Sequence, residues 1–209
     1  MLDPLNLINE VGDIRLSFKD ELNKQSHKQI ELFIEQLNKK GQSNDYYKIN
    51  RNATKMAEDQ FLGKKAECFV KYYLTKVRGF PEVKVDFEIR TGSQKGWRVD
   101  FPFNTEDKRF PNVHVKACQH NQYEYVGDYS WTFQWANKNG PGGKDGIFDG
   151  PKTDLVVLVY LENPRSSKAI IKAILQWGEI EKYLKDPIKE DLKGLKKCIY
   201  FEDLKGVCE

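Results

Sequence analysis

The chain has 209 residues, enough for one domain with an extension or for two small domains, and its hydrophobic fraction of 39% excludes a disordered protein. Its formal net charge of +3 is too small to indicate a nucleic-acid-binding protein by charge alone. The sequence begins with no basic segment followed by an apolar stretch, and its longest apolar run, 155–161, is far too short to cross a bilayer, so we expect a cytoplasmic protein with no membrane contact.

Residues 1–50 are expected to form a helical N-terminal extension. Apolar side chains recur at helical spacing from Leu5 to Leu16 and again from Ile30 to Leu37, and the polar stretch 41–45 follows as a loop. This extension would cover the core, clamp a ligand or form a dimer contact.

Residues 51–209 are expected to form the main domain. A helix is predicted over 54–77 because apolar residues recur at helical spacing, and Gly79 and Pro81 mark its end. The apolar residues then alternate with polar ones, which predicts three strands, at 83–89, 97–101 and 112–118.

The second half of the main domain opens with an irregular insertion, 119–153, rich in aromatic residues and then in glycine. Continuous apolar character over 154–162 is typical of a strand buried on both faces. A strand at 169–175, a helix from 179 and a short strand at 199–201 follow. This order predicts an α/β fold with a central mixed β-sheet flanked by helices.

Polar side chains with chemical potential fall on the predicted helix and strands. Asp100 lies on the polar face of its strand, and His114 and Lys116 lie on the polar face of the next. If the two strands are neighbours about 4.8 Å apart, these side chains converge on one surface. Glu67, at the margin of the apolar stripe of the helix, would be directed toward the same strands.

Such a set suits phosphodiester hydrolysis. Carboxylates hold Mg²⁺, a hard cation that prefers oxygen ligands. The metal polarises the phosphoryl group and lowers the pKa of a bound water, and a lysine stabilises developing negative charge.

At these positions the chain resembles the PD-(D/E)XK nuclease superfamily, which includes type II restriction endonucleases. The matching segments are 63–67, 97–100 and 113–116, and the order of elements agrees over roughly 54–175. The resemblance implies that Glu67 positions a metal or its water, that Asp100 is the central metal ligand and that Lys116 is the catalytic lysine. It also implies a restriction-endonuclease-like core.

The chain departs from the family pattern at two positions. His114 stands where the family has an acidic residue, and Val99 stands where it has proline. An imidazole at His114 would ligate a metal, act as a base or contact the substrate, and it suits Mn²⁺ better than Mg²⁺.

The expected function is therefore a metal-dependent endonuclease of restriction type, cutting double-stranded DNA with Mg²⁺ or Mn²⁺ and acting as a homodimer. Candidate DNA contacts are polar residues near the predicted turns and insertion: Gln94, Lys95, Gln119, Gln122, Asn137 and Asn139. The alternatives are a repair, recombination or mobile-element nuclease that recognises DNA structure, an RNase, a catalytically inactive nucleic-acid-binding relative, and a structural interaction domain.

Weaker patterns leave other interpretations open. Glu67, Lys116 and His114 could each be an ordinary residue of an amphipathic element. His114, Cys118 and His120 suggest zinc but lack a fourth ligand, and the four cysteines form no CxxC pair, which favours free thiols. The aromatic residues of the insertion, Trp131, Phe133 and Trp135, would either stack on bases or pack as core.

Overall fold

The structure is a computed structural model, and it describes residues 10–41, 53–88, 99–119, 130–135 and 145–207. Its strands are β1 (Glu10–Ser17), β2 (Val113–Gln119), β3 (Ser130–Gln134), β4 (Leu155–Leu161), β5 (Lys168–Gln176) and β6 (Lys196–Tyr200). Its α-helices are α1 (Asp20–Gly41), α2 (Ala53–Tyr72), α3 (Phe103–Glu106) and α4 (Trp177–Ile180), and a π-helical turn, Tyr73–Val77, continues α2.

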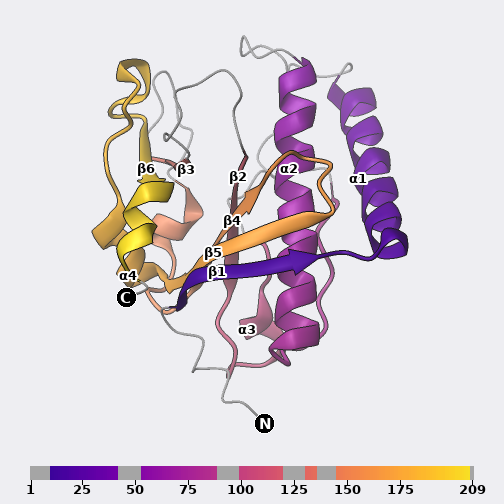
Figure 1. The fold of residues 1–209 in the computed structure, drawn as a ribbon, viewed down its shortest axis with the longest axis horizontal. Helices are drawn as coiled ribbons and strands as arrows, with labels where there is room; N and C mark the ends of the chain where they lie inside the picture. Colours follow the sequence, from indigo (N-terminus) through magenta and orange to yellow (C-terminus); the bar gives the residue numbers. More distant parts are fainter. Residues whose placement is uncertain (1–9, 42–52, 89–98, 120–129, 136–144, 208–209) are drawn as a thin grey trace.

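A mixed four-stranded sheet forms the centre of the molecule, in the order β1-β5-β4-β2 (Figure 1). β2 and β4 are parallel, whereas β4–β5 and β5–β1 are antiparallel. β2 is therefore an edge strand, and the isolated bridge between Phe101 and Val113 lies along its free side. The predicted α/β fold with a central mixed sheet is confirmed.

Both faces of the sheet are buried, as the apolar run of β4 predicted. Leu155 and Val157 belong to the core between the sheet and α2, and Val156 and Leu158 belong to a second core on the opposite face. Alternate residues of a strand point to opposite faces, so a strand covered on both sides has no polar face.

The second core lies under a small sheet in which β3 and β6 pair antiparallel. Trp131, Phe133 and Trp177 are fully buried in it, and the indole Nε1 of Trp131 donates a hydrogen bond of 2.9 Å to the carbonyl of Val159. Trp131 and Phe133 thus act as core residues, which decides between the two interpretations of the insertion for these two rings.

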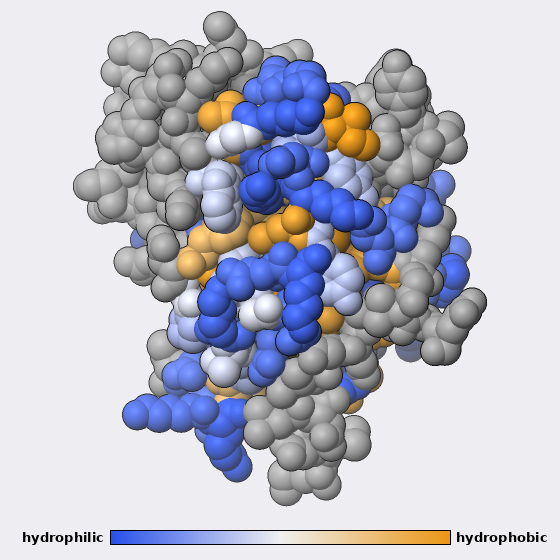
Figure 2. All heavy atoms as spheres, turned by 90° about the vertical axis from the view of Figure 1, so that its left-hand side faces the viewer, coloured by the Kyte–Doolittle hydropathy of each residue, from blue (hydrophilic) through white to orange (hydrophobic). Residues whose placement is uncertain are grey.

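The outer face of this small sheet is mostly hydrophilic. Figure 2 views the molecule from the side of β3 and β6 and shows polar residues across the centre of that face, with smaller hydrophobic patches between them. Two ion pairs lie near this sheet, Lys185 with Asp203 and Lys197 with Asp186.

Three local predictions were wrong. Residues 10–17 form strand β1 instead of a helix, because Ile14, Leu16 and Phe18 also alternate with polar residues and pairing satisfies the backbone of β5. Residues 83–88 carry the expected alternation but form no ladder, and the described part of 97–101 forms only the bridge at Phe101. The predicted helices at 30–37 and 54–77 are confirmed by α1, by α2 and by its π-helical turn.

α1 packs against α2 around a buried lysine. Lys65 is fully buried, and its Nζ donates hydrogen bonds to Asn23 Oδ1 at 2.5 Å and to Ser26 Oγ at 2.8 Å. It also lies 5.0 Å from the ring centroid of Phe18 and 5.4 Å from that of Phe69. None of these neighbours carries a negative charge, and burial lowers the pKa of Lys65 to about 8.

The Lys65→Ala variant is expected to lose about 2–5 kcal/mol of unfolding free energy, because it creates a cavity and leaves Asn23 and Ser26 without their donor. Lys65→Met keeps most of the volume and should lose less. Urea denaturation of both variants measures the difference. Equal losses would show that the ammonium hydrogen bonds, and not the volume, hold the two helices together.

Among the described helices, none is both long and apolar enough to span a membrane.

Candidate functional site

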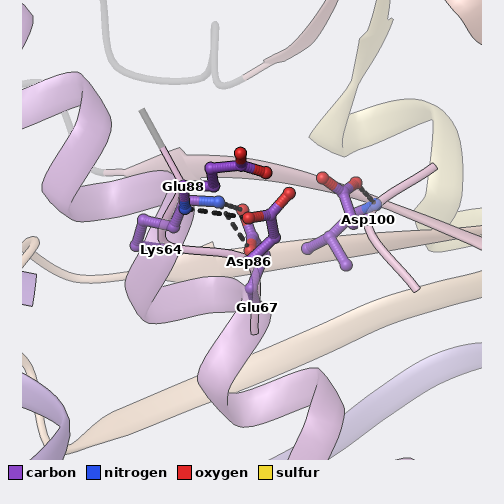
Figure 3. Close-up of polar contacts among 6 residues, drawn as sticks. Lys64, Glu67, Asp86, Glu88 and Asp100 are labelled. Carbon is purple, nitrogen blue, oxygen red and sulfur yellow. Dashed lines mark hydrogen bonds and ion pairs between the residues drawn. The ribbon is translucent and has the colours of Figure 1, made fainter. Parts of the chain in front are cut away.

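Carboxylates of α2 and of the extended segment after it lie close together. Glu67 is on α2, and Asp86 and Glu88 come from the extended segment that follows the helix (Figure 3). Lys64, one turn before Glu67, donates to both Glu67 carboxylate oxygens at 2.9 Å. The backbone N–H of Glu88 donates to Asp86 Oδ1 at 2.8 Å, which holds the Asp86 carboxylate in place.

Asp100 completes this group from the side of the sheet. The N–H of Val115 donates to Asp100 Oδ2 at 2.7 Å. Val113 N–H bonds the carbonyl of Phe101, so this N–H and that of Val115, two residues on, face the free side of the edge strand β2. Asp100 therefore lies off the edge of the sheet, where side chains from both faces can approach it.

The electrostatics of these acids are unfavourable. Burial raises the pKa of Glu67 to about 8, and the negative charges of Asp100 and Asp86 add to the rise, while Lys64 opposes it. Burial likewise raises the pKa of Asp100, against the hydrogen bond from Val115 and the charges of Lys116 and Lys64. Buried acids that repel one another are costly for stability and are typical of functional sites.

Lys116 reaches the same edge from the opposite face of the sheet. Its Nζ pairs with the carboxylate of Asp145 and lies 5.3 Å from the ring centroid of Phe133. Asp145 is buried, and its backbone N–H donates to the carbonyl of Gln134 at 2.8 Å, which anchors it beside β3. The positive charge of Lys116 acts on Asp100, so the lysine belongs electrostatically to the group.

His114 is placed differently from the other sequence-predicted site residues. It is buried, and its Nε2 lies 3.7 Å from Asp154 Oδ2, at the start of β4. Asn112 Nδ2 donates to the other oxygen of Asp154 at 3.3 Å. Burial lowers the pKa of His114 to about 4, and the charge of Lys116 adds to this, so the imidazole is neutral at pH 7.

Acidification should destabilise the protein through His114. Its folded pKa is about 4 against an ordinary 6.5, so the unfolded chain binds more protons between these values and stability falls as the pH falls through this range. Between pH 7.5 and pH 5, wild type should lose about 2 kcal/mol more unfolding free energy than His114→Gln, as measured by thermal or urea unfolding. Asp154 is present in both proteins, so only the titration of His114 distinguishes them. Identical pH dependence of the unfolding free energy would therefore contradict the prediction.

The candidate DNA contacts are mostly outside the described residues, which include only Gln119 of the six. Gln119 ends β2 and is partly buried, and its side-chain oxygen is enclosed without a hydrogen-bond partner in the described part of the chain. Gln94, Lys95, Gln122, Asn137 and Asn139 lie outside it.

The zinc interpretation gains no support from the described residues. The thiol of Cys118 is buried and its pKa is raised by that burial, while His120 lies outside the described part of the chain. Cys68, Cys118 and Cys198 are free thiols, as expected.

Sequence reasoning missed three acids of this region. The alternation over 83–89 places Asp86 and Glu88 on its polar side, but polar residues on a predicted strand do not by themselves indicate a site. Asp145 precedes a glycine in a segment without a recognisable motif. Its contact with Lys116 is made only by the fold.

The side chains gathered here offer oxygen atoms, which are the donors that a hard divalent cation prefers. No three His, Cys, Asp or Glu side chains of the described residues are arranged as a ready-made metal site. The charges of Asp100 and Asp86 oppose the ionisation of Glu67, and the Lys64 ammonium pairs with the Glu67 carboxylate. A cation among Glu67, Asp86 and Asp100 would remove that repulsion.

Comparison of the chain with protein-family models, with curated proteins and with solved structures gave no match.

Proposed function

We propose that the protein is a divalent-metal-dependent endonuclease that hydrolyses phosphodiester bonds in double-stranded DNA. One observation carries the proposal: the buried, mutually repelling carboxylates of Glu67 and Asp100, next to Asp86 and within the field of Lys116. A fold that keeps such a costly arrangement gains from it when a cation and a phosphate are bound.

The carboxylates of Glu67, Asp86 and Asp100 would hold Mg²⁺ or Mn²⁺, whose chemistry when bound is to polarise the phosphoryl group and to acidify a water. Asp100 is held by Val115 N–H, so its free oxygen keeps a fixed position at the sheet edge. Fixed ligands lose little freedom when the substrate arrives.

The two lysines have separate roles in this proposal. Lys116 approaches the edge of β2 from the side of Asp145 and would stabilise negative charge on the scissile phosphate. Lys64 holds Glu67 in the absence of a cation and would exchange that contact for the phosphate backbone.

Recognition of a specific sequence by a homodimer, as in restriction enzymes, is the finer part of the proposal and rests on the family resemblance at Glu67, Asp100 and Lys116. A palindromic site is matched by a two-fold symmetric protein.

The test is cleavage of supercoiled plasmid by the purified full chain with Mg²⁺, Mn²⁺ or EDTA. Discrete fragments that require metal would support a sequence-specific enzyme. A metal-dependent smear would support a nuclease that recognises DNA structure or that cuts without specificity. Absence of cutting with either metal, on DNA and on RNA, would refute the proposal.

A catalytically inactive nucleic-acid-binding protein is the second candidate. The observation that favours it is the placement of His114, which lies against Asp154 and does not supply a further acidic ligand beside Asp100. It predicts that plasmid shifts on a gel with or without metal and is never cut.

A further inference from the structure

A pocket of about 500 Å³ opens between α1, α2 and the segment 82–87, and its residues have no part in the proposed chemistry. α1 and α2 run side by side in Figure 1, and both helices contribute lining residues to the pocket. Its size is in the range of about 300–1,000 Å³ that is usual for sites of small ligands.

The charge of the pocket is positive. Lys71, Lys76 and Lys84 line it, and Glu82 is the only acidic residue among the described residues that line it. Glu82 pairs with Lys76, whereas neither Lys71 nor Lys84 has an ion-pair partner among the described residues. The unpaired ammonium groups would attract an anion, with phosphate as the commonest case in biology.

A buried positive charge lies behind the pocket wall. Ser26 lines the pocket and accepts a hydrogen bond from the ammonium of Lys65, whose hydrogen-bond partners among the described residues, Asn23 and Ser26, are uncharged. An anion in the pocket would offer Lys65 the negative charge that its own surroundings lack.

The walls of the pocket also present aromatic rings. Phe18 stacks on Phe69 with centroids 3.9 Å apart and meets Tyr72 edge to face at 5.7 Å. Tyr72 is 38% exposed although it is a large ring, and Phe87 lies on the facing segment. An exposed tyrosine ring beside cations suits a ligand that joins a flat ring to an anionic group.

The pocket shares its walls with the carboxylate group. Within α2, Glu67 belongs to the carboxylates while its neighbours Cys68 and Lys71 line the pocket. Within the following segment, Asp86 belongs to the carboxylates while Val85 and Phe87 line the pocket. The two sites are therefore built on the same two elements, with Asp86 between two residues that line the pocket.

We propose that this pocket binds one unpaired nucleotide of a nucleic-acid strand, displaced from the duplex or at its end, with its phosphate at Lys71 and Lys84 and its base against Tyr72. The proposal deepens the proposed nuclease function and rests on it for the identity of the strand. The binding itself needs neither metal nor cleavage, so the two proposals fail separately.

The test is carried out in EDTA with the full chain. Titration calorimetry measures binding of adenosine 5′-monophosphate, adenosine and inorganic phosphate, and fluorescence anisotropy measures binding of a labelled single-stranded oligonucleotide. The variants are Lys71→Gln, Lys84→Gln and Tyr72→Leu. Lys28→Gln, an exposed lysine of α1 that does not line the pocket, is the matched control.

We expect the monophosphate to bind at least about tenfold more tightly than adenosine or inorganic phosphate, and the oligonucleotide to compete with it. Each pocket variant should lower the affinity for the monophosphate and for the oligonucleotide about fivefold to tenfold, and Lys28→Gln should change neither affinity. Binding of the monophosphate without competition by the oligonucleotide would overturn the assignment to a strand and leave a free nucleotide. Equal affinity for inorganic phosphate, or no effect of the three variants, would overturn the pocket as a nucleotide site.

Discussion

Glu67→Gln and Asp100→Asn are expected to lose metal-dependent cleavage at least about 100-fold, because each removes a negatively charged oxygen donor from the proposed cation site. Both substitutions keep the shape of the side chain. Asn at position 100 can still accept the hydrogen bond from Val115 N–H, so the edge of the sheet is preserved. Plasmid cleavage with Mg²⁺ or Mn²⁺ measures the loss.

Glu67→Gln should at the same time be more stable than wild type by roughly 0.5–2 kcal/mol, since activity and stability oppose each other at sites that hold costly charges. Burial and the charges of Asp100 and Asp86 raise the pKa of Glu67 to about 8, and a neutral amide avoids that cost. Differential scanning calorimetry measures this change in stability. Mg²⁺ or Mn²⁺ should raise the unfolding temperature of wild type more than that of the variant.

Glu58→Gln is the matched control, because Glu58 is an exposed carboxylate on the same helix. It should change neither cleavage nor the effect of the metal. If Glu67→Gln cut DNA as well as wild type did, the carboxylates would have no catalytic role, whatever their effect on stability.

Lys116→Ala is expected to reduce cleavage about 10²–10³-fold, as is usual when a group that stabilises transition-state charge is removed. The single variant also leaves the buried carboxylate of Asp145 without its partner, which should cost about 1–3 kcal/mol. Loss of activity could then follow from loss of structure alone.

The double variant Lys116→Met with Asp145→Asn separates these effects. It removes both charges of the pair and keeps the volume, so its stability should return to near that of wild type. Cleavage should remain lost if Lys116 acts on the phosphate. Recovery of cleavage in the double variant would show that Lys116 only compensates Asp145. Urea denaturation and plasmid cleavage are measured on the same protein samples.

Much of the fold followed from local patterns. The apolar run at 154–162 and the helical spacing at 54–77 each had one physical solution, since a strand with no polar face must be covered on both sides and a helix stripe must face a core. β4 and α2 lie where these patterns placed them. Glu67 and Asp100 were also identified from the sequence, and the structure brings them close enough for the charge of Asp100 to raise the pKa of Glu67.

Long-range pairing decided what local patterns left open. The apolar residues around Ile14 fit both helical and strand spacing, and only the exposed edge of β5 selected the strand. The alternation over 83–88 resembles a strand, yet within the described part of the chain it pairs with no strand. It instead carries Asp86 to the carboxylates.

The site shows the same division. The sequence by itself determined which side chains share a strand face, so His114 and Lys116 were expected together. The tertiary structure gives each of them a different acidic partner. His114 lies next to Asp154 at the start of β4, and Lys116 pairs with Asp145 before the short helix Gly146–Asp149. Both acids arrive from segments distant in the chain, and no local spacing encodes such contacts, because they depend on where the sheet places its edge.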